Sequence, residues 1–565
     1  MELRQLVKEV PYLLETRGDM SVEIAALCSN SREKTENGIF FCFAGAHFDA
    51  HQYAPQAVQN GCVALVVERF LDDVNVPQVL VSNGRAAMAR ISEAFFNHPE
   101  RKMRFVGITG TKGKTTTSYM VKSICEQAGF KCGLVGTTGN MIGEKHIPSS
   151  KTTPDPIDLM RDLNEMVQAG VQVVVMEVSA HALDMHRLDG MTFECGCYTN
   201  LSQDHLDYFG TMENYFQCKK AFFTSGMAKN AAINADDERA AELLRDVTIP
   251  HMTYGIAAEA DLFARDIEIT ENGVSFELRL RNAEYIQINL RMTGMFNVYN
   301  ALSAAACALI LGVSPENVRA GLESIHSVPG RIEMLPTNTP YRVILDYAHA
   351  PDALSNILRT CRTFTKKRLI ALFGCGGDRD KGKRPIMGRI GGELADLCIL
   401  TSDNPRTEDP MEILREIEEG IKETTGEYVV IENRRDAIRH ALDQGYRTLI
   451  LVCALGGRLD HTLANIQNAA SAAAEGANVT ILDEREEITF LTGGTLRLPR
   501  RKGWGLSVFS LTDRCTGVCL RGVKYRLEDA VLTNRVPLGV SNEFAAPEAE
   551  ISLTQGILMI AQTKK

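Results

Sequence analysis

The sequence lacks the features that mark secreted, membrane-spanning or zinc-thiolate proteins. Its 15 cysteines include no CxxC pair, and the nearest spacings, Cys195-x-Cys197 and Cys515-x-x-x-Cys519, favour isolated thiols in a reducing cytosol. No apolar run approaches the ~20 residues of a membrane-spanning helix, and residues 1–17 carry charges throughout where a signal peptide would be apolar. Positive charge is not in excess, because the net charge is −10, so neither nucleic acid nor an anionic membrane is expected as a partner. We therefore expect a cytoplasmic protein that is not inserted in a membrane.

The chain of 565 residues is too long for one hydrophobic core, so several domains are expected. Residues 1–100 have the pattern of a small α/β unit. Residues 101–330 alternate strands and helices, which favours a parallel sheet with helices on both faces. Residues 331–500 form another α/β block. Residues 501–565 are rich in short strands separated by turns, as in a small β-sandwich. The predicted fold class is therefore α/β with an appended β-sandwich.

A glycine-rich turn joins an expected strand at 105–108 to an expected helix that ends near Gly129. The turn comprises Gly110, Thr111, Lys112, Gly113, Lys114, Thr115 and Thr116. Backbone N–H groups, a helix N-terminus and the charge of Lys114 together favour phosphate binding, and Thr115 can offer its hydroxyl to Mg²⁺. The usual spacing would place a glycine at 108, where this chain has Ile108. The alternative is an ordinary glycine-rich strand–helix turn.

Two further segments place polar side chains after short strands. Glu177 follows the apolar run 171–175, and His205 lies in the segment Thr199–Asp207 behind another strand. Because ligands bind at the carboxyl edge of open α/β sheets, this carboxylate and imidazole can complete a Mg²⁺ shell beside the phosphate loop. The alternative is a pair that caps a helix or is hydrogen-bonded in the core.

The third block contains two candidate ligand-binding turns. The segment Phe373–Arg384 is a charged glycine loop, for which a solvated charge run is the alternative. The turn Asp403-Asn404-Pro405-Arg406 offers a carboxylate, an amide and a guanidinium, which can hold an amino acid by both charged ends. Its alternative is a helix N-cap turn.

With these motifs the sequence closely resembles the Mur ligases, and within them the UDP-N-acetylmuramoyl-tripeptide synthetases of peptidoglycan synthesis, from residue 1 to about 452. The motifs are Gly110–Thr117, Thr152-Thr153-Pro154, Met176–Leu183 with Arg187, Thr199–Gly210, Tyr215–Lys219, Gly294–Asn300, Gly330-Arg331, Asp346–Asp352, Gly374–Pro385 and Asp403–Arg406. The resemblance implies a UDP-binding domain, a central ATPase domain and a Rossmann-like domain. It also implies ATP-dependent amide ligation, in which a substrate carboxylate is phosphorylated and an amino acid amine then displaces phosphate.

The resemblance also assigns roles to individual residues. Catalysis and Mg²⁺ binding fall to Lys114, Glu177, His205, Thr115 and Lys219, the last as a carbamylated lysine. Asn297, Arg331 and Asp346 match nucleotide contacts. The UDP-sugar dipeptide would be bound by Ser31, Gly45, His51, Thr152, Thr153, Ser179 and Arg187, with Asn30 departing from the family's usual aspartate. The residues Arg379, Asp403, Asn404 and Arg406 match the form that binds meso-diaminopimelate, because arginines pair with carboxylates that lysine lacks.

The pattern breaks after the expected strand 448–453. There the family has Gly-Lys-Gly-His-Glu, whose glutamate helps bind diaminopimelate, and this chain has Ala454–Asn465 with Arg458, which would repel an ammonium group. From about 440 to 562 the sequence resembles the C-terminal half of thiamine pyrophosphokinase, as in Gly539–Phe544. The first half of that kinase, with its acidic metal-binding motifs, has no counterpart, so we expect no kinase activity from the tail alone. The segment 479–482 is expected to supply a last strand to the third block.

The sequence therefore predicts a ligase that adds meso-diaminopimelate to UDP-N-acetylmuramoyl-L-alanyl-D-glutamate with ATP and Mg²⁺. The alternatives are a ligase with an impaired acceptor site, a thiamine-binding or pyrophosphokinase-related tail, and an inactive nucleotide-binding protein. The predicted partners are small molecules, and dimerisation through the tail is left open.

Overall fold

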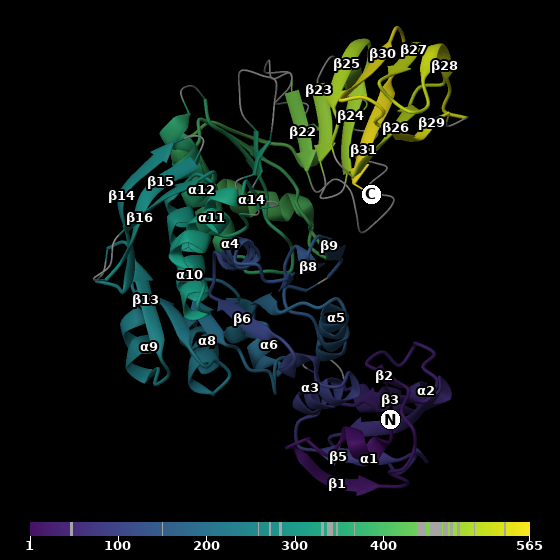
Figure 1. Cartoon of the computed structure of the whole chain (residues 1–565), viewed down its shortest axis with the longest axis vertical. Coiled ribbons are helices and arrows are strands. Elements are labelled where there is room, and N and C mark those ends of the chain that lie inside the picture. The colour runs from purple at the N-terminus through teal and green to yellow at the C-terminus, as the bar shows by residue number, and fades with distance from the viewer. Residues whose placement is uncertain are drawn as a thin grey trace. The chain divides into compact units, whose positions relative to one another are not determined.

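The computed structural model describes most of the chain, in two compact units, Met1–Val328 and Pro329–Lys565 (Figure 1). The described residues are 1–45, 49–149, 151–257, 259–270, 273–281, 285–328, 333–335, 343–345, 348–365, 368–434, 436–437, 440, 448–452, 466, 470, 473–474, 478–482, 486–501, 503–535 and 538–564.

The first unit begins with a five-stranded sheet. Its strands, in spatial order, are β1 (Leu13–Arg17), β5 (Gln78–Val81), β4 (Cys62–Val67), β3 (Gly38–Phe41) and β2 (Ala26–Cys28). Helices α1 (Leu3–Leu6) and α3 (Gly84–Phe95) contribute to a core on one face, and α2 (Ala54–Gln59) contributes to a core on the other. The short 3-10 helices are η1 (Ala50–Tyr53) and η2 (Pro99–Arg101). The expected strands near 39, 63 and 78 are all present, because each is a compact apolar run that becomes buried on folding.

The same unit continues into an eleven-stranded sheet. The spatial order is β16 (Tyr285–Leu290), β15 (Gly273–Leu280), β14 (Leu262–Thr270), β13 (His251–Gly255), β12 (Ala231–Asn234), β11 (Cys195–Tyr198), β6 (Arg104–Thr109), β10 (Val173–Glu177), β7 (Cys132–Gly136), β8 (Gly139–Ile142) and β9 (Lys145–Ile147). Strands β14 through β7 are parallel neighbours, as expected, while the hairpins at both edges are antiparallel additions.

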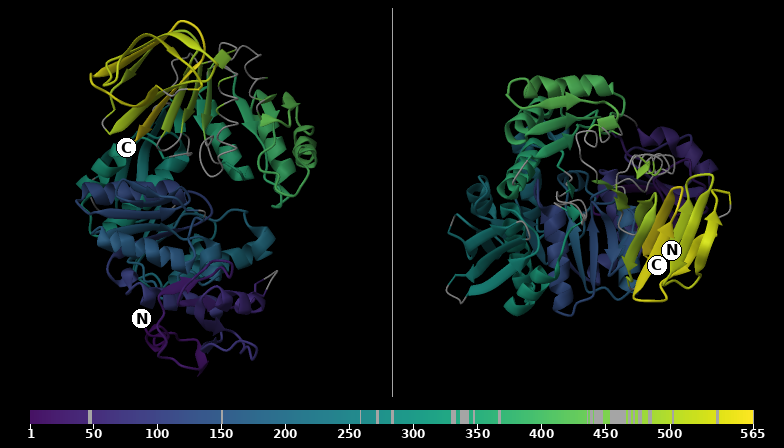
Figure 2. Two further views of the ribbon diagram at one scale, coloured as in Figure 1. Left: turned by 90° about the vertical axis from the view of Figure 1, so that its right-hand side faces the viewer. Right: turned by 90° about the horizontal axis from the view of Figure 1, so that it is seen from above.

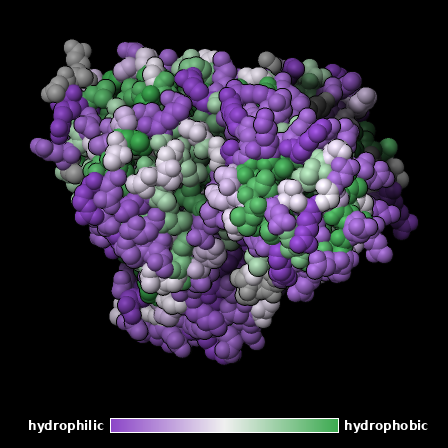
Figure 3. Space-filling model, turned by 90° about the horizontal axis from the view of Figure 1, so that it is seen from below, coloured by the Kyte–Doolittle hydropathy of each residue, from purple (hydrophilic) through white to green (hydrophobic). Residues whose placement is uncertain are grey.

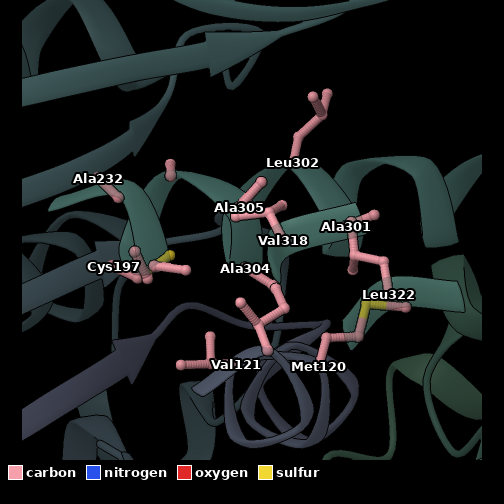
Figure 4. Packing of buried hydrophobic residues seen from close by; sticks show 14 of the residues in the cluster. Met120, Val121, Cys197, Ala232, Ala301, Leu302, Ala304, Ala305, Val318 and Leu322 are labelled. Carbon is pink, nitrogen blue, oxygen red and sulfur yellow. The ribbon is translucent and has the colours of Figure 1, made fainter. Parts of the chain in front are cut away.

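Helices cover both faces of this sheet. They are α4 (Lys114–Gln127), α5 (Pro156–Gln168), α6 (Ala180–Asp184), α7 (Leu206–Phe209), α8 (Met212–Thr224), α9 (Ala240–Asp246), α10 (Met295–Ile310) and α11 (Pro315–Ser324). On one face, α4, α10 and α11 pack into a single core (Figure 4). Small side chains on α10, such as Ala301 and Ala304, let it approach Met120 and Val121 of α4. This packing brings the start of α10 close to the phosphate loop.

The second unit begins with an α/β block. It contains the hairpin β17 (Glu333–Leu335) and β18 (Val343–Leu345), the parallel sheet β19 (Ile370–Phe373), β20 (Leu397–Leu400) and β21 (Tyr428–Val430), and helices α12 (Pro351–Phe364), α13 (Lys383–Leu394) and α14 (Pro410–Ile421). Each strand expected in 343–431 is present. Strand β18, however, pairs with β17 and not with β19.

The remaining strands of this unit form two sheets around one apolar core (Figure 2). The first contains β22 (Thr448–Val452), β23 (Asn478–Leu482), β24 (Glu486–Leu491), β31 (Leu558–Lys564), β26 (Trp504–Ser510) and β29 (Gly539–Glu543). The second contains β25 (Gly494–Pro499), β30 (Glu548–Leu553), β27 (Cys515–Arg521) and β28 (Leu527–Leu532). The predicted β-sandwich is confirmed.

The segment 479–482, expected to supply a last strand to the third block, forms β23. This strand pairs with β22, itself an expected strand of that block, on one side and with β24 on the other, and neither β22 nor β23 belongs to the sheet of β19, β20 and β21. Strand β24 continues the ladder to β31, so β23 is bonded on both sides within the tail. The strands therefore pair across residue 500, and the domain boundary between 500 and 501 stays a prediction.

Hydrophilic side chains cover much of the face seen in Figure 3, and they separate its apolar areas from one another. None of the helices in the described part of the chain combines the length and the apolar character needed to cross a membrane.

Candidate active site

The phosphate loop lies between β6 and α4, as the sequence predicts. Gly110 (φ 143°) and Gly113 (φ 84°) have backbone conformations that favour glycine, and there is no room for a side chain at either position. A Cβ atom at Gly110 would overlap Oγ1 of Thr199, and one at Gly113 would lie 2.5 Å from Oδ1 of Asn300. Lys114 reaches back over the loop and donates to the carbonyls of Gly110 (2.9 Å) and Thr111 (3.0 Å). The side chain of Lys114 therefore links the two ends of the phosphate loop by hydrogen bonds.

Glu177 is the buried carboxylate beside this loop. It ends β10, which pairs with β6, and its side chain is fully buried. Thr115 donates from Oγ1 to Glu177 Oε2 at 3.0 Å, while Thr137 donates from its backbone N–H (2.9 Å) and its hydroxyl (3.1 Å). The two oxygen ligands expected for Mg²⁺ thus face each other, and hard oxygen donors of this kind suit that ion.

Lys219 lies on α8 and points into the same region. It is 1 % exposed, donates from Nζ to the carbonyl of Gly110 at 3.0 Å, and sits 4.3 Å from the centre of the Tyr215 ring. Burial, assisted by the charge of Lys114, holds the pKa of Lys219 well below its usual range. The amine is thereby biased towards its neutral, nucleophilic form.

His205 lies just before α7 and is partly exposed. Its φ of 55° is in the left-handed region, and its ring stands edge-to-face against His181 at 4.8 Å. Desolvation lowers the pKa of His205 to about 4, although Asp204 opposes the shift. The imidazole is therefore neutral near pH 7, the form in which histidine ligates metals.

Four residues expected to bind the UDP-sugar dipeptide form one hydrogen-bonded group next to Glu177. Thr153 donates to the Glu177 carbonyl at 2.8 Å and accepts from the backbone N–H of Ser179 at 3.1 Å. Arg187 donates to the Thr153 carbonyl at 2.8 Å, and Thr152 and Thr137 share a hydroxyl contact of 3.0 Å. Ser179 also caps α6 by accepting from Ala182. The structure thus brings these predicted residues together.

Asn297 reaches the loop through a neighbour. It accepts from Nδ2 of Asn300 at 3.0 Å, and Asn300 lies directly against Gly113. Both asparagines are buried near the start of α10. Asn297 therefore supports the loop indirectly, by holding the side chain of Asn300 against Gly113.

The remaining predicted UDP-binding residues lie in the first sheet. Ser31 donates to Gln56 at 3.1 Å, and Gly45 is half-buried. His51 is 2 % exposed, with Nδ1 2.6 Å from Asp49 and Nε2 accepting from the backbone N–H of Glu68 at 3.0 Å. Both ring nitrogens of His51 are thus engaged within the protein, which fits a role in holding the backbone at Asp49 and Glu68 in place.

In the second unit, the charged glycine loop and the Asp403–Arg406 turn lie side by side. Gly377 donates to the carbonyl of Asn404 at 2.8 Å, and Arg406 donates to the carbonyl of Gly377 at 3.0 Å. Arg379, Asp403, Asn404 and Arg406 are all exposed. The N-cap of α14 is Asp409 and not this turn. Arg331 and Asp346, which were predicted to contact the nucleotide, lie outside the described residues, as does the segment 454–465.

Sequence reasoning missed several residues that organise the site. Asn200 accepts from the Lys112 N–H at 2.9 Å, and Thr137 holds Glu177. Their only sequence signal is their position after strands that end at the same sheet edge as β6. Arg384 is fully buried and pairs with Glu408 and Glu416, which a charge-rich loop does not reveal in the sequence.

Another set of potential metal ligands lies at the end of α3. Glu93, His98 and Glu100 converge, but Arg90 pairs with Glu93 at 2.5 Å and Arg101 with Glu100 at 3.2 Å. Each carboxylate already has a guanidinium group as its neighbour, so we assign no ion there.

Comparisons with known proteins agree with this geometry. The Mur ligase middle domain matches residues 108–308, the Mur ligase glutamate ligase domain matches 330–458, and the thiamin pyrophosphokinase vitamin B1 binding domain matches 495–558. The chain belongs to the Mur ligase family.

Its similarity to particular members is high. It is 43 % identical over 467 residues to UDP-N-acetylmuramoyl-L-alanyl-D-glutamate--2,6-diaminopimelate ligase 1 of Clostridium acetobutylicum, covering 82 % of this chain and 95 % of that protein. It is also 43 % identical over 456 residues to the corresponding ligase of Caldanaerobacter subterraneus subsp. tengcongensis, covering 80 % and 93 %. A solved structure of a ligase of the same name has a TM-score of 0.58 at 29 % identity and covers 79 % of this chain and 91 % of that chain.

Proposed function

We propose that the chain is an ATP-dependent ligase that adds meso-diaminopimelate to UDP-N-acetylmuramoyl-L-alanyl-D-glutamate in the cytoplasm, during peptidoglycan precursor synthesis. The contact of Thr115 with Glu177 beside the lysine-closed loop carries this proposal, because it joins a phosphate cradle to a buried oxygen donor set. The names of the 43 % identical relatives supply the substrates.

In the first step, an oxygen of the substrate carboxylate attacks the γ-phosphorus of ATP, and ADP leaves. Lys114 and the backbone N–H groups of the loop stabilise charge on the transferring phosphoryl group. Thr115, Glu177 and His205 are the residues that would hold Mg²⁺, which when bound neutralises charge on the phosphate oxygens. Burial of Glu177 keeps water from its oxygens and strengthens the local electrostatic interactions.

Lys219 is proposed to be carbamylated. Its neutral amine attacks CO₂, a C–N bond forms, and one proton is released to solvent, which leaves a negatively charged carbamate in place of a neutral amine. The depressed pKa of Lys219 supports this chemistry, because only the unprotonated amine has the required lone pair.

In the second step, the amine of diaminopimelate attacks the acyl phosphate carbon, phosphate leaves and the amine loses a proton. Thr152, Thr153, Ser179 and Arg187 are proposed to bind the dipeptide. Ser31, Gly45 and His51 are proposed to serve the uridine end. The exposed group of Arg379, Asp403, Asn404 and Arg406 would receive the amino acid, with bidentate arginines on its carboxylates. Asn297, Arg331 and Asp346 are proposed nucleotide contacts.

The proposal is tested by ADP release that requires both the UDP-dipeptide and diaminopimelate, with the amide product identified by mass. A panel of amino acids should compare the full chain with a variant in which 454–458 is replaced by Gly-Lys-Gly-His-Glu. Release of phosphate with no amide product, cured by that replacement, would indicate an impaired acceptor site. No turnover in either protein would contradict the proposal.

A second candidate function is thiamine binding by the tail, favoured by the match to the vitamin B1 binding domain at 495–558. In the segment Gly539–Phe544, buried Asn542 accepts from the N–H of Tyr525 at 2.9 Å and donates to its carbonyl at 2.8 Å, so this segment has a fixed shape. Calorimetry with millimolar thiamine tests it, and the absence of binding heat would exclude it.

A further inference from the structure

Two loops of the second unit are joined by an exchange of carboxylates. One loop, Gly374–Lys383, follows β19, and the other, Thr401–Asp409, follows β20. Because β19 and β20 are adjacent parallel strands, both loops leave the sheet at its carboxyl edge. Close approach is possible because Gly377 has no side chain: a Cβ atom there would overlap the carbonyl of Pro405.

Each loop supplies a carboxylate that the other loop binds. Asp378 accepts from the backbone N–H of Thr407 at 3.2 Å and from its hydroxyl at 2.8 Å. In return, Glu408 accepts from the backbone N–H of Asp378 at 2.5 Å and pairs with Lys381 at 3.0 Å. We call Asp378, Arg384, Thr407 and Glu408 the loop clasp.

Arg384 is the buried centre of the clasp. Its side chain is fully buried, and it donates to both oxygens of Glu408, at 3.0 and 2.9 Å, and to Glu416 of α14 at 2.7 Å. A buried guanidinium is costly unless its charge is matched, so the site strongly favours this one arrangement. Hydrogen bonding from Arg384 lowers the pKa of Glu408 to about 2, so this carboxylate stays charged throughout the physiological pH range.

The backbone is strained at one residue of the clasp and at one residue beside it. Asp378 and Arg406 both have φ of 52°, in the left-handed region that non-glycine residues rarely adopt. Such conformations persist where the surroundings fix them, and they gather at binding sites. Within the clasp, Arg384 is buried and Glu408 half-buried, and the exposed Asp378 and Thr407 are hydrogen-bonded to each other. The neighbouring residues that face solvent are Arg379, Asp403, Asn404 and Arg406.

We propose that Glu408 and Arg384 are positioning residues for the acceptor: through the loop clasp they preform an exposed receptor for the ammonium and carboxylate groups of an amino acid. The inference rests on the proposed ligase function. Under this inference Glu408 and Arg384 raise the affinity for the amino acid without touching it. They do so because a binding site that is already ordered loses less conformational freedom when the amino acid binds.

The test compares Glu408→Gln with Glu423→Gln in the full chain. Glu423 is a matched control, because it is an exposed glutamate that pairs with Arg389 in the same block. Glu408→Gln should raise KM for diaminopimelate about 10- to 100-fold, because small displacements of a binding group have effects of that size. KM for ATP and for the UDP-dipeptide should change less than about twofold, a split that general destabilisation would not produce. Glu423→Gln should leave all three values unchanged.

Two further variants keep the test decisive if Glu408→Gln does not fold. Thr407→Val removes one exposed hydroxyl from the clasp and should raise the same KM alone by a smaller factor. Arg384→Lys should retain more acceptor affinity than Arg384→Met. Equal changes in all three KM values, or an unchanged KM for diaminopimelate in Thr407→Val and Glu408→Gln, would overturn the inference. A wild-type chain without diaminopimelate-dependent turnover would instead refute the proposed function.

Discussion

The hydroxyl of Thr115 lies 3.0 Å from Oε2 of Glu177, although 62 residues separate the two in the sequence. The parallel pairing of β6 with β10 produces this contact, since Thr115 lies in the first turn of the helix that follows β6 and Glu177 ends β10. The positions of the phosphate loop and the buried carboxylate are therefore both set by two strands that are hydrogen-bonded to each other.

Replacing Glu177 by glutamine should reduce turnover about 100- to 1000-fold, because it removes a buried charge that serves phosphoryl transfer. The shape of the side chain is retained, so the unfolding midpoint should change little. The control is Glu165→Gln, at an exposed position on α5 paired with Lys145. ADP release at saturating substrates measures the effect, and activity within threefold of wild type would contradict it.

Alanine at Gly113 should prevent nucleotide binding. Gly129 provides a matched comparison, because φ is 84° at Gly113 and 86° at Gly129, so both substitutions carry the same backbone strain of about 1–2 kcal/mol. Only at Gly113 does the new Cβ meet a neighbour, Asn300, while Gly129 has open space around it. Titration with ADP should therefore show much weaker binding by Gly113→Ala than by Gly129→Ala. Equal affinities would show that the space beside Asn300 is unimportant.

Much of the site could be predicted from the sequence because it consists of short motifs at the ends of strands. Gly110–Thr116 and Glu177 needed only a strand pattern and the rule that parallel strands share a carboxyl edge. The support for Glu177 by Thr137 could not be predicted, since it depends on the pairing of β7 with β10 in space. The same holds for Arg384, whose burial follows from the packing of α13 against α14.

Stability of the first unit should depend on the protonation of Glu93. Burial raises the pKa of Glu93 to about 8, with Glu100 adding to the shift and Arg90 opposing it. An unfolded glutamate titrates near about 4.3, so between these two values the folded chain binds one more proton. The stabilisation of the folded state by protonated Glu93 is complete below about pH 4.3 and is lost as the pH rises to about 8. The free energy of unfolding falls by at most roughly 1.4 kcal/mol for each pH unit.

Glu93→Gln tests this pH dependence. The variant should gain stability relative to wild type when the pH is raised from 5.5 to 8.5, as followed by the unfolding midpoint of the full chain. The exposed Glu15 of the same unit serves for comparison, and Glu15→Gln should run parallel to wild type. A constant difference between Glu93→Gln and wild type at the two pH values would exclude a titration of Glu93 in this range.

The tail core should be sensitive to Leu520 and insensitive to Leu538. Leu520 is fully buried between the two sheets, whereas Leu538 is 61 % exposed. Leu520→Ala should cost about 2–5 kcal/mol, and Leu538→Ala within about 0.5 kcal/mol. Trp504 is the one tryptophan of the sequence and lies in β26, so its fluorescence reports unfolding of the tail alone. If Leu520→Ala and Leu538→Ala had the same unfolding midpoint by tryptophan fluorescence, the described core would be contradicted.

The strands of the tail were predicted better than their pairing. Each short run from 505 to 552 becomes a strand because its apolar and turn residues act locally. Which strands become neighbours depends on contacts between distant segments, and a single sequence holds no local signal for these. The segment 479–482 is an example: β23 pairs with β22, an expected strand of the third block, and also with β24, which connects both strands to the sheet of the tail.

The order of strands in the tail also fixes when it can fold during synthesis. Strand β31, the last element of the chain, lies between β24 and β26, and Glu486 pairs with Thr563. This sheet can close only after residues 558–564 have left the ribosome, by which time the phosphate loop and its sheet have long emerged. A chain truncated before Leu558 would keep the whole first unit and carry a tail without β31, the strand between β24 and β26.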